Sequence, residues 1–211
     1  MYTDPAVVRR KVERELSDFV ERIDHYRSRG IWILEYRFPE LLVAFATPHI
    51  KPYALAPYAV LMDLSNYDIE PPSLRFVNPF TREPLKRREI PTNLQRLTLE
   101  GNPQQLPVVK FNPQAGGVLM LPPTMANQDL LQAWAPEDDR PFVCLQGVRE
   151  YHDNPGHTGD PWWLHRAKGM GGICRLLDLL SKYGTEAMRE AEYQMKLEVR
   201  GIIHQIPAEP I

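Results

Sequence analysis

The chain has 211 residues, of which 43% are hydrophobic, and its net charge at pH 7 is −2. This length suits one large domain, and the near-zero charge gives no general electrostatic attraction to nucleic acid. Two cysteines, Cys144 and Cys174, are too few for a disulfide framework. No stretch approaches the roughly 20 apolar residues that cross a bilayer, and the N-terminus has no apolar signal region. We therefore expect a cytoplasmic protein with neither nucleic acid nor membrane as a partner.

The first expected element is a helix over 5–28. Asp4 and Pro5 form a typical helix start, because an aspartate caps free backbone amides and proline suits the first helical position. Apolar side chains then recur at three- and four-residue steps, which places them on one helix face. They are Val8, Val12, Leu16, Phe19, Val20, Ile23 and Tyr26. Gly30 is suited to end the helix, which we expect to lie along a sheet.

Four strands are expected next, because apolar, aromatic and β-branched residues gather in short runs. The runs are 31–38, 41–47, 58–64 and 73–77. Pro39 and Glu40 separate the first two runs. A helix followed by four consecutive strands favours an α+β fold, in which the N-terminal helix packs on a four-stranded antiparallel meander.

The pattern weakens over 80–140, where Pro, Asn, Gln and Gly interrupt it repeatedly. Short strands are expected there over 94–99, 107–111 and 117–121, and one or two helical turns over 125–134. We interpret 80–140 as an insertion in a single domain that spans 1–211.

C-terminal helices are expected after a polar segment at 142–166. Ile173, Leu176, Leu177 and Leu180 stand at helical steps within 164–183, and Gly184 is suited to end that helix. A further helix is expected over 185–199, followed by an irregular tail.

Side chains that bind metals are concentrated in 142–166. If 142–152 is extended, Cys144, Glu150 and His152 point to one face, because alternate residues of a strand share a side. A turn at 153–156 then brings His157 back to complete a set of four. Thiolate, imidazole and carboxylate are ligands of Zn²⁺, which usually takes four in tetrahedral geometry. We therefore predict a zinc site formed by Cys144, Glu150, His152 and His157.

Other interpretations of this segment remain open. Asp160 or His165 can replace Glu150 as a ligand. Glu150 can also orient a metal-bound histidine, or act as general base beside a metal-bound water, which would make the protein a zinc-dependent hydrolase. The simplest alternative is a polar loop in which each histidine finds a hydrogen bond.

The segment 62–79, MDLSNYDIEPPSLRFVNP, resembles the centre of ubiquitin-conjugating enzymes, with a strand, a Tyr-Pro/Pro-Pro loop, a second strand and a proline turn. The matching residues are Tyr67, Pro71, Pro72, Leu74, Phe76 and Pro79. Asp68 stands where that family has proline, and its His-Pro-Asn motif is missing from this sequence. The resemblance implies a ubiquitin-conjugating-enzyme-like fold. It also places Cys144, within Phe-Val-Cys-Leu, where a thioester-forming cysteine is expected, and such a carrier needs an exposed, metal-free thiol.

The order and spacing of Cys144, Glu150, His152 and His157 is similar to a bacterial family named for its Cys-Glu-His-His ligands. Its members are encoded beside ubiquitin-like proteins and the enzymes that activate, conjugate and remove them. The resemblance implies a non-enzymatic accessory protein with a structural zinc ion. Its expected partners are the ubiquitin-like protein or its activating and conjugating enzymes. Because zinc makes a sulfur a poorer nucleophile, this hypothesis competes with the carrier hypothesis for Cys144.

Overall fold

The computed structural model describes residues 3–51, 54–99, 109–112, 117–120, 125–133 and 139–190. It is an α+β structure built on a four-stranded antiparallel sheet, as predicted. Among the described residues, no helix combines the length and the apolar character that crossing a bilayer requires.

The N-terminal helix is divided in two. Helix α1 spans Pro5–Glu21 and helix α2 spans Ile23–Ser28. The Asp4 carboxylate accepts a hydrogen bond from the backbone N–H of Ala6 at 2.8 Å, which is the predicted cap. The prediction of one continuous helix is wrong at Arg22, whose N–H bonds to the carbonyl of Phe19, three residues back, at 3.1 Å. The predicted apolar face is buried except at Ile23, which is half-buried, and at Val20, which is 60% exposed.

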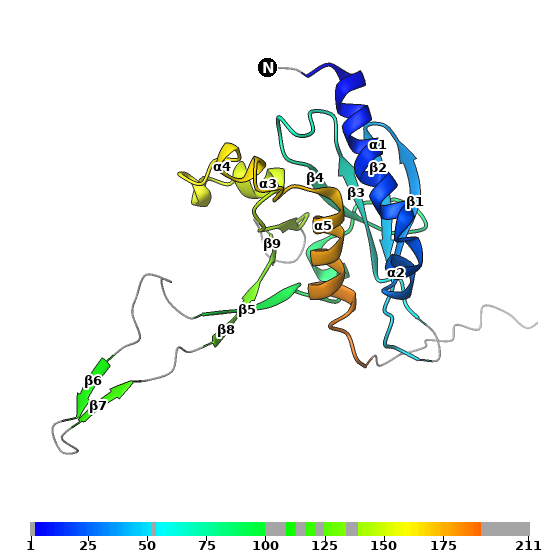
Figure 1. Ribbon diagram of the computed structural model, residues 1–211. Coiled ribbons are helices and arrows are strands. Elements are labelled where there is room, and N and C mark those ends of the chain that lie inside the picture. Colours follow the sequence, from blue (N-terminus) through cyan, green and yellow to red (C-terminus); the bar gives the residue numbers. More distant parts are fainter. Residues whose placement is uncertain are drawn as a thin grey trace, which may run out of the picture.

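The sheet has the order β1-β2-β3-β4, with every neighbouring pair antiparallel. Its strands are β1 (Ile31–Arg37), β2 (Glu40–Phe45), β3 (Tyr58–Asp63) and β4 (Ser73–Val77). All four strands were predicted, because short apolar runs bounded by turn residues favour strands. The helix α1 and the later helix α5 (Ile173–Leu180) pack against one face of this sheet and form the main core with it (Figure 1).

The segment 80–140, interpreted from the sequence as an insertion, contains two further strand pairs. Strand β5 (Gln95–Leu99) pairs with β8 (Met125–Asp129), and β6 (Val109–Asn112) pairs with β7 (Gly117–Met120). These pairs extend away from the four-stranded sheet (Figure 1). The prediction of helical turns over 125–134 is wrong, because pairing with the distant β5 outweighs weak local preferences. Within the described residues, the strands predicted at 107–111 and 117–121 are present, and the one predicted at 94–99 is present from Gln95.

The C-terminal part consists of short elements. A two-residue strand β10 (Phe142–Val143) pairs with β9 (Leu131–Gln132). Helix α3 (Arg149–His152), a 3₁₀ turn at Pro155–His157 and helix α4 (Trp163–Arg166) follow. The helix predicted over 164–183 is therefore interrupted, and its apolar part survives as α5. A Cβ at Gly171 would lie 2.8 Å from the Trp162 ring, so this stretch packs too closely for a side chain.

Helix α5 ends in a π-helical turn at Ser181–Thr185, beside the buried side chain of Tyr58. The Tyr58 hydroxyl donates to the carbonyl of Leu180 at 3.0 Å. A Cβ at Gly184 would lie 2.0 Å from that hydroxyl, so glycine makes room for it. The helix predicted over 185–199 is not present at 188–190, and its remainder lies outside the described residues.

Candidate functional site

The extended conformation predicted for 142–152 is wrong. The strand ends at Val143, a turn follows, and α3 begins at Arg149. Gly147 has a φ of +96°, and a Cβ there would lie 2.1 Å from the carbonyl oxygen of Met170. The turn therefore depends on glycine, and Cys144, Glu150 and His152 do not share one strand face.

Glu150 is turned toward the four-stranded sheet. Its carboxylate accepts hydrogen bonds from the Ser73 hydroxyl and, at 3.2 Å, from the backbone N–H of Leu74. The neighbouring Arg149 donates its backbone N–H to the carbonyl of Pro72 at 2.9 Å. These contacts join α3 to the Pro-Pro loop and to the start of β4. They also give the Glu150 carboxylate and the Arg149 N–H hydrogen-bond partners from the protein itself.

Cys144 and His157 lie together. The Cys144 Sγ is 3.2 Å from the His157 Nε2. His157 is carried by the 3₁₀ turn that begins at Asn154, whose side chain accepts from the N–H of Gly156 at 2.8 Å. The ring of Tyr151 stacks on the His157 ring with 3.9 Å between centroids. The turn therefore returns the imidazole to the sulfur, and Tyr151 fixes the plane of the ring.

His152 and His165 are bound to Asp160 instead. The His152 Nε2 accepts from the N–H of Gly147 at 3.1 Å, so its Nδ1 carries the proton that it donates to the Asp160 carbonyl at 2.9 Å. Burial lowers the pKa of His152, which favours this neutral form. The Asp160 carboxylate contacts the His165 Nε2 and accepts from the Tyr151 hydroxyl at 2.7 Å. Hydrogen bonds from Tyr151 and His165 hold the pKa of Asp160 well below its usual range.

Of the four predicted zinc ligands, the structure therefore brings Cys144 to His157, ties His152 to backbone groups and turns Glu150 to β4. Within the described ranges, no three or more His, Cys, Asp or Glu residues are arranged to hold a metal ion. As they stand, the residues fit two ligands of a four-ligand zinc site.

A cavity of about 190 Å³ opens beside the sulfur. It is lined by Arg96, Gln128, Cys144, Leu145, Gln146, Tyr151, His157, Met170 and Arg175. Cys144 itself is 5% exposed, so it lacks the open exposure that the carrier hypothesis requires. Burial raises the pKa of the Cys144 thiol, while the positive charge of Arg96 acts in the opposite direction. The thiol is therefore protonated at neutral pH, and reaction requires a base.

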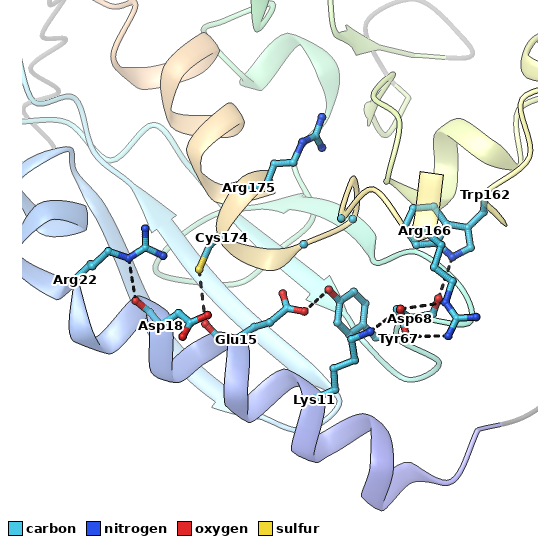
Figure 2. A pocket seen from close by; sticks show the side chains of 13 residues that line it. Lys11, Glu15, Asp18, Arg22, Tyr67, Asp68, Trp162, Arg166, Cys174 and Arg175 are labelled. Atoms are coloured by element: carbon cyan, nitrogen blue, oxygen red, sulfur yellow. Dashed lines mark hydrogen bonds and ion pairs between the residues drawn. The ribbon is translucent and has the colours of Figure 1, made fainter. Parts of the chain in front are cut away.

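A second cavity, of about 310 Å³, lies between α1, the loop before β4 and the start of α5 (Figure 2). The Glu15 carboxylate accepts from the Tyr67 hydroxyl at 2.6 Å and from the backbone N–H of Ile173 at 2.9 Å. Asp68 forms ion pairs with Lys11 and Arg166. Asp68 thus ties α1 to α4, and the charged groups of this cavity largely satisfy each other.

A model of the Y4jH-like family matches residues 3–188 of the chain. The chain belongs to the Y4jH-like family. Within it, the uncharacterized protein y4jH of Sinorhizobium fredii (strain NBRC 101917 / NGR234) is 39% identical over 201 residues, which cover 95% of this chain and 93% of that protein. The range that the Y4jH-like family model matches includes Cys144, His157 and every described residue that lines the cavity beside them.

Sequence reasoning missed several residues of the site, among them Tyr151, Arg96, Gln128 and Arg175. Tyr151 stands between two predicted ligands, and an aromatic ring beside histidines was a usable signal. Arg96 and Gln128 belong to β5 and β8, and no local pattern connects them to Cys144. Their cross-strand pairing, with the Arg96 Nε donating to the Gln128 Oε1 at 2.8 Å, emerges only from the fold.

Proposed function

We propose that this protein carries an acyl group as a thioester on Cys144, in the manner of ubiquitin-conjugating enzymes, and that His157 accepts the thiol proton. The observation that carries the proposal is the 3.2 Å separation of the Cys144 Sγ and the His157 Nε2 beside a cavity. A nucleophile and its base act at such distances. The base is needed here because burial raises the pKa of the thiol.

The proposed step is a transthiolation. The Cys144 Sγ attacks the carbonyl of an incoming thioester while its proton passes to the His157 Nε2. The carbon–sulfur bond of the incoming thioester then breaks, and the departing thiolate takes the proton from His157. One thioester replaces another, so no oxidant, reductant or metal enters the balance.

The scaffold supports this choice of reaction class. The α+β order of a helix, a four-stranded meander and later helices resembles ubiquitin-conjugating enzymes, and so does the Tyr67 to Pro72 loop. That loop is joined to the site through α3, because the Arg149 N–H at the start of α3 bonds to the carbonyl of Pro72 and Tyr151 of the same helix stacks on His157. The proposed partners are a ubiquitin-like protein and its activating or conjugating enzymes.

Burial of Cys144 departs from the open exposure expected of a carrier, and it restricts the form of the acyl donor. A cysteine that is 5% exposed cannot meet a bulky surface, so the acyl group must enter the cavity as a narrow chain. The C-terminal tail of a ubiquitin-like protein has this form, particularly when it ends in glycine.

A synthetic peptide thioester ending in Gly-Gly tests the proposal without the natural partner. We expect the Cys174→Ala variant to form one adduct, mapped by mass spectrometry to Cys144 and cleaved by hydroxylamine. His157→Gln should slow its formation by about 10²-fold, the lower end of what general-base catalysis supplies. An adduct that persists after Cys144→Ala, or one whose rate ignores His157, would contradict the proposal.

A zinc-binding accessory role is the second candidate. It is favoured by the same pair of atoms, since two ligands of one tetrahedral zinc ion lie roughly 3.6 Å apart, given bonds of about 2.3 and 2.0–2.1 Å. Glu150 and His152 would have to leave their present hydrogen bonds to complete the predicted set. Elemental analysis of the purified protein decides the matter. One zinc per chain that is lost in Cys144→Ala supports this role, and absence of stoichiometric metal rejects it.

A further inference from the structure

The cavity beside Cys144 has an unbalanced charge. Two guanidinium groups, those of Arg96 and Arg175, line it, and none of the described residues that line it is acidic. Among the ion pairs of the described residues, none involves either arginine. Buried or half-buried arginines usually face a carboxylate or phosphate, so two of them without one indicate a missing anion.

Arg175 is held in place by neutral groups. Its NH1 donates to the backbone carbonyls of Met170 and, at 3.4 Å, of Gln146. Burial lowers the pKa of this guanidinium, which shows that nearby acids do not offset its desolvation. Arg175 also borders the second cavity, but Figure 2 shows its guanidinium turned away from Glu15 and Asp18. Its charge is therefore directed to the Cys144 side.

Arg96 is oriented by the strand pair of the insertion. Its Nε donates to the Gln128 Oε1 at 2.8 Å, which leaves the two terminal nitrogens of the fork for another acceptor. Its charge acts on the Cys144 thiol electrostatically. Asp160 contacts two residues of the lining, Gln146 and Tyr151, but its carboxylate is already occupied by them and by His165.

We propose that this cavity is an anion site in which Arg96 and Arg175 bind a carboxylate group next to the Cys144 sulfur. The ligand class is a carboxylate-bearing molecule, either the free C-terminus of a peptide chain or a small organic acid. The role of this site in acyl transfer rests on the proposed function. Carboxylate binding itself does not, because it can be measured without acyl transfer. For an acyl carrier, the same two charges would also stabilise the oxyanion that forms when Cys144 attacks a carbonyl.

Two alkylating reagents that differ in charge test the site. Iodoacetate and iodoacetamide both transfer a methylene carbon to sulfur and release iodide, while the thiol proton leaves to His157 and then to water. In the Cys174→Ala protein, we expect the ratio of the iodoacetate rate to the iodoacetamide rate at Cys144 to exceed that of N-acetylcysteine about tenfold, as one charge-assisted hydrogen bond supplies.

Substitutions of the two arginines distinguish an effect of their charge from an effect on the fold. Arg96→Gln and Arg175→Gln should each return the ratio toward that of N-acetylcysteine, while Arg175→Lys keeps part of it. Arg10→Gln, at an exposed position of α1, is the matched control and should change nothing. A ratio equal to that of N-acetylcysteine, or one unaffected by both Arg96→Gln and Arg175→Gln, overturns the proposal. Failure of Cys144 to react with either reagent in the folded protein also overturns it.

Protection experiments distinguish the two sources of carboxylate. The probes are a peptide ending in Gly-Gly with a free C-terminus, the same peptide as its amide, and acetate. Slower iodoacetamide reaction with the free-acid peptide alone identifies a chain terminus as the ligand. Slowing by acetate as well identifies a small carboxylate. No protection by any probe counts against the site. If Cys144 forms no thioester but keeps the raised ratio of the iodoacetate rate to the iodoacetamide rate, the proposed function is rejected and the anion site is not.

Discussion

Glu15 is expected to hold three parts of the molecule together, and the strength of that connection can be calculated and measured. Its carboxylate accepts from the Tyr67 hydroxyl and from the backbone N–H of Ile173, so it joins α1 to the loop before β4 and to the first residue of α5. Tyr67 is 4% exposed, and a hydroxyl left without a partner there cannot be rescued by water easily. Removing the carboxylate therefore leaves two donors unsatisfied.

The magnitude follows from these two contacts. Each donor left unsatisfied costs about 1–3 kcal/mol, so Glu15→Ala should lower the free energy of unfolding by roughly 2–6 kcal/mol. Tyr67→Phe removes one donor together with its need for a partner and should cost about 1 kcal/mol. Because both changes remove the same bond, the double variant should be more stable than additivity predicts by about 1–3 kcal/mol.

Urea unfolding followed by circular dichroism measures all four proteins of this cycle. Glu13→Ala is the matched control, since Glu13 is exposed on the same helix and should change stability by less than about 0.5 kcal/mol. The dependence of the unfolding free energy on urea should stay the same, because a similar surface unfolds in each variant. Additive effects of Glu15→Ala and Tyr67→Phe would refute the reasoning.

Three further predictions concern other contacts. Gly184→Ala should destabilise the protein by about 1–3 kcal/mol through overpacking against the Tyr58 hydroxyl, and adding Tyr58→Phe should recover part of the loss in thermal unfolding. The pKa of Asp160 is lower in the folded chain than its unfolded value near 3.9, so its contribution is present above about pH 4 and is lost as the pH falls below it. Asp160→Asn should therefore flatten the fall in melting temperature between about pH 5 and 2, and an unchanged slope contradicts this. Glu150→Ala should cost about 1–3 kcal/mol by leaving the N–H of Leu74 unpaired, and equal zinc content in both proteins would assign Glu150 to folding alone.

Much of the sheet and of its helical cover could be predicted because local signals and tertiary packing agree there. The apolar face of α1, the four strands and the apolar part of α5 follow from periodicity and from the residues that end each run. Where a local pattern competes with close packing, prediction fails. Gly147 was not recognised as a turn residue, because the group that leaves no room for a Cβ there is the carbonyl of Met170, 23 residues further along the chain.

The candidate site was predictable only in part for the same reason. The sequence Asn154-Pro155-Gly156 indicated the turn that returns His157 to Cys144, and the structure has that turn. Treating Glu150 and His152 as ligands assumed an extended backbone, and α3 replaced it. The arginine and glutamine of the cavity could not be assigned, since the pairing of β5 with β8 crosses the whole insertion.

The cavity wall that carries Arg96 and Gln128 is supplied by the insertion and by none of the four strands of the main sheet. Changes in the length or sequence of the insertion can therefore alter which molecules reach the Cys144 sulfur without altering the four-stranded sheet. The opposite wall, which carries Arg175 of α5, belongs to the main core, so only one side of the cavity can vary without changing the fold.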